Sequence, residues 1–134
     1  MNTLRLQGFG HQHITAQHKT TLEFTQENEV SPQGDCLVAR SVDFDPAKMR
    51  SFMQHVSRVR ITIQASDVMD TLECIPNPDF FDTKELVVRM SGVQTSRTVG
   101  IHATKSARML NPALVERLRN PEQTVVILFE EAVA

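Results

Sequence analysis

The chain has no tryptophan and no tyrosine, and apart from five histidines its only aromatic residues are seven phenylalanines. Aliphatic side chains and methionine must therefore fill most of any core. Acidic and basic residues nearly balance, with a formal net charge of −2, which excludes a strong overall attraction to nucleic acid or to an anionic membrane. The arginines are scattered and no aromatic platform for bases accompanies them, so nucleic-acid binding is not favoured.

Long apolar runs are also missing, because no stretch approaches the roughly 18–20 residues that a membrane-spanning helix needs. The first ten residues, MNTLRLQGFG, lack the charged start and apolar segment of a signal peptide. Cysteine is scarce as well, with only Cys36 and Cys74, and reduced thiols are the expectation for such a chain. We therefore expect a cytoplasmic protein without a membrane segment, folded as a single domain over residues 1–134.

The first half of the chain shows strand patterns on both sides of a helix signal. Residues 13–24 alternate with period two and predict a long strand, and residues 35–42 predict a second strand after the turn Ser31–Gly34. Asp45-Pro46 is a typical helix start, since Asp can accept the free amides of the first turn and Pro suits the first helical position. A strand over 59–65 follows.

The second half repeats this order. Strands are predicted over 84–90, 97–103 and 124–129, and Asn111-Pro112 repeats the helix start. One offset of 66 residues aligns the helix start, the buried helix stripe and the next strand, through the pairs Pro46 and Pro112, Phe52 and Leu118, Ile61 and Ile127. Internal self-similarity of this kind indicates a duplication.

Each half, about 13–65 and 84–131, is therefore predicted to be a strand–strand–helix–strand unit. About 50 residues cannot bury their apolar faces alone, so we expect the two units to interleave. The predicted fold is mainly β with two short helices, a six-stranded barrel that leaves no exposed sheet edge. The element order, with Gly-Asp at the second strand, resembles the cradle-loop barrels. Residues 67–75 are predicted to form an extra hairpin with 58–65.

Four short stretches carry polar side chains: GHQH at 10–13, HKTT at 18–21, GDC at 34–36 and HATKS at 102–106. Together they resemble the family named domain of unknown function 371, which consists of small, mostly archaeal proteins. The matching motifs are Gly-His near the start, His-Lys-Thr-Thr and Gly-Asp-Cys. Where this chain has Gln33 and His13, the family more often has Arg and Asn. The family has no established reaction, so the resemblance concerns the fold and leaves the activity open.

The HKTT stretch favours anion binding. On a strand, Lys19 and Thr21 would share one face as a cation and a hydroxyl donor, and such groups hold phosphate or carboxylate by charge-assisted hydrogen bonds. The second half offers a similar set of cations and hydroxyls. We expect a small anionic ligand to bind where the halves meet, with these contributing residues: His11, His18, Lys19, Thr20, Thr21, Asp35, Arg97 and Lys105. An ordinary solvated strand face is the alternative interpretation of the same residues.

Other chemistry stays open at this point. His11 and His13 project to one side of an extended chain, and with Cys36 they could hold a metal ion, although no complete ligand set or cofactor is indicated. Cys36 could also act as a nucleophile with His18 as its base, but its place on an apolar face favours an inert thiol. Asp35 follows a turn glycine, where its carboxylate can accept backbone amides.

Two other functional classes are therefore alternatives to a binding protein. One is an enzyme that acts on an anionic ligand through His18, Lys19 and Asp35. The other is an accessory module of a nucleic-acid or protein complex, for which a flat exposed apolar patch would be the expected feature.

Overall fold

The computed structural model describes residues 2–133, which form eight strands, two α-helices and one turn of 3₁₀ helix. In chain order these are β1 (Thr3–Phe9), β2 (Thr21–Thr25), β3 (Leu37–Ala39), α1 (Pro46–His55), β4 (Val59–Ala65), β5 (Val68–Pro76), β6 (Glu85–Arg89), β7 (Thr98–Ile101), η1 (Ala107–Met109), α2 (Pro112–Leu118) and β8 (Thr124–Glu131).

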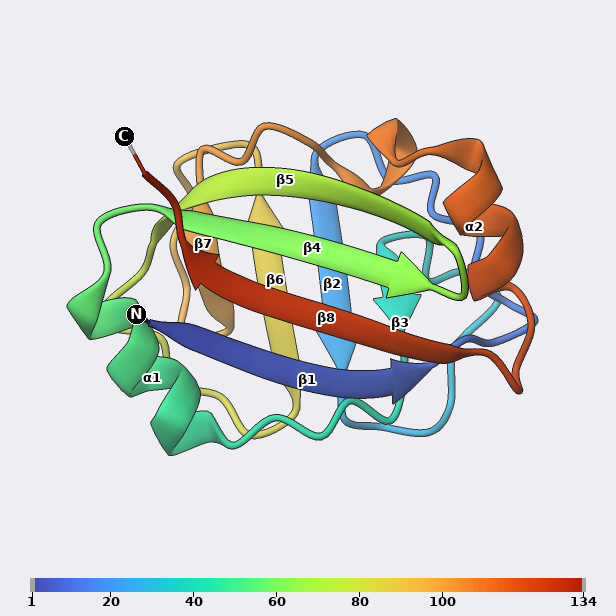
Figure 1. Ribbon diagram of the computed structural model, residues 1–134, viewed down its shortest axis with the longest axis horizontal. Coiled ribbons are helices and arrows are strands. Elements are labelled where there is room, and N and C mark those ends of the chain that lie inside the picture. The colour runs from blue at the N-terminus through green and yellow to red at the C-terminus, as the bar shows by residue number, and fades with distance from the viewer. Residues whose placement is uncertain (1, 134) are drawn as a thin grey trace.

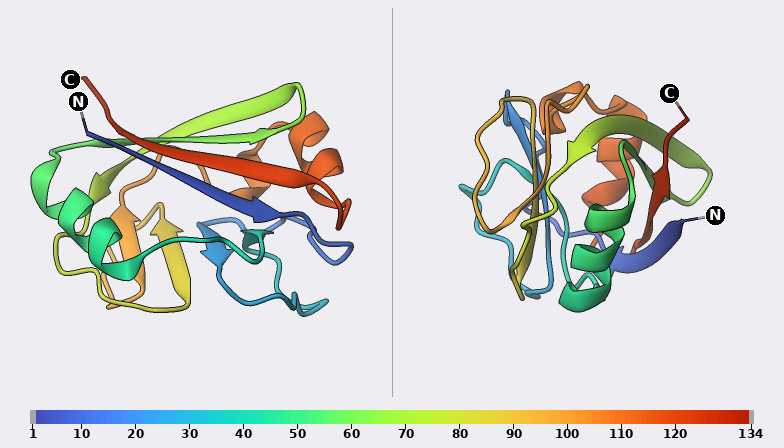
Figure 2. Two further views of the ribbon diagram at one scale, coloured as in Figure 1. Left: turned by 60° about the horizontal axis from the view of Figure 1, so that its bottom comes forward. Right: turned by 90° about the vertical axis from the view of Figure 1, so that its left-hand side faces the viewer.

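All eight strands belong to one mixed sheet in the order β1-β8-β4-β5-β7-β6-β2-β3. The sheet folds over on itself, so that β1, β8, β4 and β5 form one layer and the other four strands run across behind them (Figure 1). Helices α1 and α2 lie at opposite ends of the molecule, and both termini lie at the same end (Figure 2). The core between the layers contains fully buried side chains from both, including Leu22, Phe24, Ile61, Ile63, Leu86, Leu114 and Phe129.

The two helix starts are confirmed. The Asp45 carboxylate accepts hydrogen bonds from the amides of Ala47 (2.9 Å) and Lys48 (3.2 Å), and the Asn111 side chain accepts the Ala113 amide at 2.9 Å. These caps satisfy amides that a helix cannot pair internally. The helices then bury the predicted stripes, which comprise Met49, Phe52 and Met53 in α1 and Leu114 and Leu118 in α2. No helix among residues 2–133 is long and apolar enough to cross a membrane.

The predicted closed six-stranded barrel is not confirmed, since the structure has eight strands and no ladder closes the sheet. Its end strands approach each other at one antiparallel bridge, where Phe9 and Arg40 exchange two backbone hydrogen bonds of 2.9 Å. The extra hairpin is confirmed as β4 and β5, which pair from Val59–Cys74 to Ala65–Val68.

Two strand predictions were wrong at the N-terminal end of the chain. Strand β1 was not predicted, because Gly8 and Gly10 interrupt its short alternating pattern. The strand predicted over 13–24 is formed only from Thr21 onward. Residues 14–20 instead form a loop, in which Ala16 adopts a φ of 50°, a left-handed conformation that no strand contains. Thr-rich alternation fits an extended loop as well as it fits a strand.

Strand pairing relates the two halves in a regular way. Strands β4 and β8 pair antiparallel with Thr62 opposite Leu128, two positions 66 residues apart in the chain. Strands β2 and β6 likewise pair antiparallel, with Glu23 opposite Val87. Each half also contains one parallel pair of strands, β2 with β3 in the first half and β6 with β7 in the second. The register shifts between Glu23 and Phe24 in the first pair and between Val87 and Val88 in the second.

Backbone hydrogen bonds outside the strands recur in the same way. The amide of Ser41 donates to the Glu27 carbonyl, and the amide of His102 donates to the Ser91 carbonyl (2.9 and 3.1 Å). Ser41 and His102 both have a left-handed φ, 52° and 51°. This conformation is unusual for residues other than glycine.

The segment after β1 attaches the start of the chain to the end of α2. The Gly10 amide donates to the Gln123 carbonyl and the His11 amide to the Leu118 carbonyl, both at 2.9 Å. A Cβ atom at Gly10 would lie 2.3 Å from the Asn120 carbonyl oxygen and 2.4 Å from that of Leu118. The Gly-His motif is therefore explained by close packing against a helix terminus.

Replacement of Gly10 by alanine should accordingly destabilise the fold, because the methyl group would meet two backbone oxygens that cannot move independently. We expect Gly10→Ala to lower the free energy of unfolding, measured in urea, by about 1–3 kcal/mol. Gly34→Ala is the matched control: its nearest neighbour would lie at 3.3 Å and its φ is not left-handed, so its effect should be much smaller. Equal losses in the two variants would contradict this packing argument.

Candidate functional site: a pocket where the two halves meet

The loop at 14–20 is held between the two halves by main-chain hydrogen bonds. The Asp35 carbonyl accepts the amides of Gln17 (3.0 Å) and His18 (3.1 Å), both from this loop. From the second half, the amide of Arg108 in η1 donates to the His18 carbonyl at 3.1 Å. Within the loop, Ala16 is buried. These contacts place loop side chains beside the turn before β3 on one side and beside η1 on the other.

The imidazole of His18 organises the turn into β2. Its Nδ1 accepts hydrogen bonds from the amides of Thr20 (3.2 Å) and Thr21 (3.1 Å). In the second half the Asp82 carboxylate does the same for the amides of Lys84 and Glu85, at 3.1 and 2.8 Å, at the start of β6. Because an acceptor at Nδ1 carries no proton, His18 is a turn-capping residue here with its proton on Nε2.

A pocket of about 500 Å³ opens beside this loop, and we call it the cationic pocket; its lining residues are Ala16, Gln17, Lys19, Asp35 and Arg108. Lys19 and Asp35 come from the first half and Arg108 from the second. Within residues 2–133, none of these three charged side chains has an ion-pair partner within 4.0 Å. Two unpaired cations and one unpaired carboxylate therefore border the same volume.

A second pocket of about 450 Å³ adjoins the first, since Gln17 and Arg108 line both. Leu110, Pro112 and Val115 contribute an apolar wall to it, so we call it the apolar pocket. Its remaining lining residues are polar or charged: Thr15, Glu116 and Arg119. Both pockets lie between the 14–20 loop of the first half and the η1–α2 segment of the second.

Other residues predicted for the site lie elsewhere. The amides of Thr20 and Thr21 bond to the His18 ring, and neither threonine lines a pocket with Lys19. His11 Nδ1 accepts the His13 amide at 3.0 Å, and burial is the main cause that lowers the pKa of His11, with the neighbouring His13 and Arg40 adding to it. Neutral His11 is therefore part of the packing around α2.

The two predicted cations of the second half are engaged in ion pairs. The Lys105 ammonium contacts the Asp70 carboxylate, which also accepts the Asn111 amide at 2.8 Å. Burial alone would raise the pKa of Asp70, but the Lys105 and amide hydrogen bonds outweigh it and lower the pKa. Arg97 contacts Glu85 directly and lies 3.7 Å from Glu23. Neither cation lines the cationic pocket.

The carboxylate of Glu23 is a titratable group that sequence reasoning missed. Only 7% of this residue is exposed, although it lies on a strand face that alternation predicts to be polar. Burial, with a smaller effect of the adjacent Glu85 carboxylate, raises the pKa of Glu23 to about 7 against the opposing influence of Arg97 and Arg89.

Cys36 lies next to this cluster and is not an activated nucleophile. Burial is the main cause that raises the pKa of its thiol to about 11, and the charges of Glu23 and Asp35 add to the effect. The thiol therefore stays protonated at neutral pH. Asp35 was expected to accept backbone amides through its carboxylate. In the described part of the chain its carbonyl does so instead.

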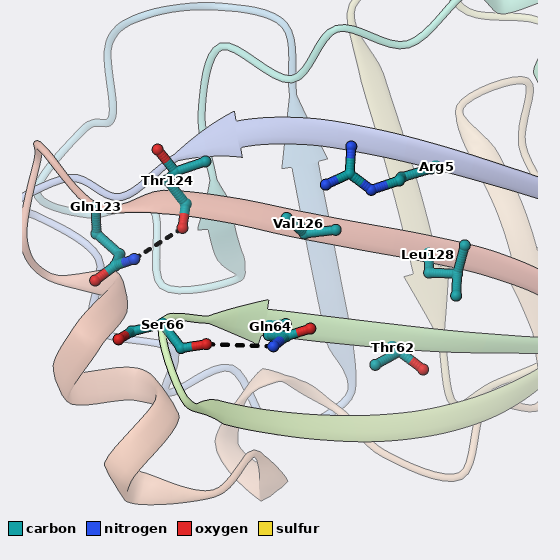
Figure 3. Close-up of a pocket in the computed structure, with 8 residues that line it drawn as sticks. All are labelled: Arg5, Thr62, Gln64, Ser66, Gln123, Thr124, Val126 and Leu128. Carbon is teal, nitrogen blue, oxygen red and sulfur yellow. Dashed lines mark hydrogen bonds between the residues drawn. The ribbon is translucent and has the colours of Figure 1, made fainter.

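A third hollow, of about 500 Å³, lies on the outer face of β1, β8 and β4 (Figure 3). Arg5 is its only charged lining residue, and the rest are neutral. The amide groups of Gln64 and Gln123 are hydrogen-bonded locally, to the carbonyls of Ser66 (3.2 Å) and Thr124 (2.9 Å), as the dashed lines show. This face therefore offers fewer groups for an anion than the cationic pocket.

Across residues 2–133, no three His, Cys, Asp or Glu side chains lie close enough together to hold a metal ion. His11, His13 and Cys36 accordingly do not form a three-ligand group.

The fold is that of a small, mainly β protein with two α-helices and one mixed eight-stranded sheet. The chain belongs to the family described as domain of unknown function (DUF371), whose model matches residues 6–131. It is also 26% identical over 122 residues to the uncharacterized protein MJ0206 of the archaeon Methanocaldococcus jannaschii, covering 87% of this chain and 90% of that protein. The resemblance inferred from the Gly-His, His-Lys-Thr-Thr and Gly-Asp-Cys motifs is thereby confirmed.

The buried carboxyl group of Glu23 predicts a pH-dependent stability. The pKa of Glu23 is raised from 4.5 to about 7 by folding, so the folded state binds the proton more tightly and stability should fall as pH rises from about 5 to 8. Glu23→Gln resembles the protonated carboxyl group and should remove most of this loss of stability. The free energies of unfolding of variant and wild type should differ on the order of 2 kcal/mol at pH 8 and differ little at pH 5.

Urea unfolding at both pH values measures the effect, with Glu122→Gln as a control that removes an exposed carboxylate. An unchanged pH dependence in Glu23→Gln would contradict the raised pKa of Glu23.

Proposed function

We propose that this protein binds a small phosphate- or carboxylate-bearing ligand in the cationic pocket between its halves. The observation that supports the proposal is the position of Lys19 and Arg108, which come from different halves, line one pocket and have no ion-pair partner within residues 2–133. Other cations of this protein, such as Arg58, Arg97 and Lys105, are paired with carboxylates.

The chemistry of the lining residues suits such a ligand. A lysine ammonium and an arginine guanidinium both bind phosphate or carboxylate oxygens by charge-assisted hydrogen bonds, which are about twice as strong as neutral ones. The Gln17 side chain adds a neutral donor. A volume of about 500 Å³ lies within the range of small-molecule sites.

The proposal includes the internal duplication. The site lies at the junction of two copies of one unit, and the two copies together form a sheet that nearly closes into a barrel. It is supported by the 66-residue relation across the β4–β8 pairing and by matching caps at His18 and Asp82. The bridge between Phe9 and Arg40 corresponds to the pairing of Ile75 with Ile101. Sites at such junctions draw lining residues from both copies.

Binding is favoured over catalysis by the state of the candidate catalytic groups. His18 Nδ1 is occupied by the two amides that it caps, so it is not available as a general base. The thiol of Cys36, with a pKa of about 11, is not a nucleophile at neutral pH.

The proposal predicts that anion binding depends on both cations. A thermal-shift screen with inorganic phosphate, organic phosphates and small carboxylates should identify at least one anion that raises the unfolding midpoint of the wild type. Lys19→Ala and Arg108→Ala should each weaken its binding about tenfold or more, since a hydrogen bond to a charged group contributes about 1.5–3 kcal/mol.

Lys48→Ala, which removes another exposed lysine from α1, is the matched control and should bind like the wild type. The unliganded midpoints of all three variants should stay close to that of the wild type, because exposed cations contribute little to folding. Anion binding that is equal in Lys19→Ala, Arg108→Ala and wild type would refute the proposed site.

A further inference from the structure

The adjoining pockets are larger than an inorganic anion requires. The cationic pocket alone, at about 500 Å³, has the volume of roughly sixteen waters at about 30 Å³ each. The apolar pocket, which Gln17 and Arg108 also line, adds about 450 Å³. A ligand that fills both must therefore carry an organic body as well as its anionic group.

Asp35 limits which chemical groups the ligand can carry next to its anionic group. Asp35 lines the cationic pocket together with Lys19 and Arg108, and its negative charge would repel a ligand that presents only acceptor oxygens. An ionised carboxylate accepts hydrogen bonds and donates none, so the ligand must offer a donor there. A hydroxyl group close to the phosphate meets this requirement.

The apolar pocket restricts the rest of the ligand. Leu110, Pro112 and Val115 form its apolar wall, and such a wall favours an apolar or planar group. Arg108 and Arg119 also line this pocket, and guanidinium groups stack on planar rings. The Glu116 carboxylate can accept hydrogen bonds from an amino group on such a ring.

We propose that the ligand is a nucleoside monophosphate, an inference that rests on the anion-binding function proposed above. The phosphate binds Lys19 and Arg108 in the cationic pocket, and a sugar hydroxyl donates to Asp35. The planar base lies in the apolar pocket against Val115. The two adjoining pockets thus match the three chemical parts of this class of molecule in order.

Isothermal titration calorimetry with the whole chain tests the assignment through truncated ligands. The four ribonucleoside monophosphates are compared with ribose 5-phosphate, which lacks the base, with inorganic phosphate and with the unphosphorylated nucleosides. We expect at least one nucleotide to bind at least tenfold more tightly than ribose 5-phosphate. Ribose 5-phosphate should in turn bind more tightly than inorganic phosphate, and the nucleosides should bind most weakly.

Variants distinguish the contributions of the two pockets to the binding affinity. Val115→Asn, which adds a polar group but no charge beside Arg108, should weaken nucleotide binding at least tenfold and leave ribose 5-phosphate binding within about twofold of wild type. Asp35→Asn should weaken both ligands, because the hydroxyl loses its charged acceptor. Since Val115 is half-buried and its replacement can unfold the helix, the ligand series on the wild type tests the inference without any variant.

The outcomes distinguish the two proposals. If inorganic phosphate and ribose 5-phosphate bind as tightly as every nucleotide, and do so through Lys19 and Arg108, the nucleotide inference is wrong and the anion site stands. If no phosphate compound binds, the nucleotide inference is wrong. If neither phosphates nor carboxylates bind, or if their binding is unchanged in Lys19→Ala and Arg108→Ala, the anion site itself is wrong.

Discussion

The main-chain contacts of the 14–20 loop are the constraint on which the proposed site depends. The Asp35 carbonyl holds two loop amides from one side, and the Arg108 amide holds the His18 carbonyl from the other. Backbone groups make these bonds, so the distance between the halves at this point is set independently of the side chains that face the pockets. Lys19, Asp35 and Arg108 can therefore serve a ligand without also holding the fold together.

Much of the fold could be predicted from the sequence because its strongest signals are local. The helix starts at Asp45 and Asn111 depend on one capping side chain and one proline each, and both form as expected. The offset of 66 residues holds for the helices and for β4 and β8, where no insertion intervenes. The earlier strands depart from it, because their connecting loops differ in length between the halves.

The parts that could not be predicted depend on long-range contacts. The alternation places Lys19, Thr21 and Glu23 on the polar face of the predicted strand, but Glu23 is buried next to Glu85 of β6 and Arg97, which no local pattern reveals. The HKTT motif predicts that Lys19 binds a ligand; in the structure Lys19 lines the cationic pocket and has no ion-pair partner within residues 2–133. The other cation of the pocket is Arg108, whereas Arg97 and Lys105, which were expected there, belong to ion pairs.

The ligand is proposed to bind between the two halves. Titration of the ¹⁵N-labelled protein with nucleoside monophosphates, followed by amide chemical shifts, locates the binding site. The account predicts that the largest shift changes cluster at Gln17, Lys19, Asp35 and Arg108 and extend to Val115. It would be contradicted if they clustered instead on the outer sheet face, around Arg5, Gln64 and Thr124 (Figure 3).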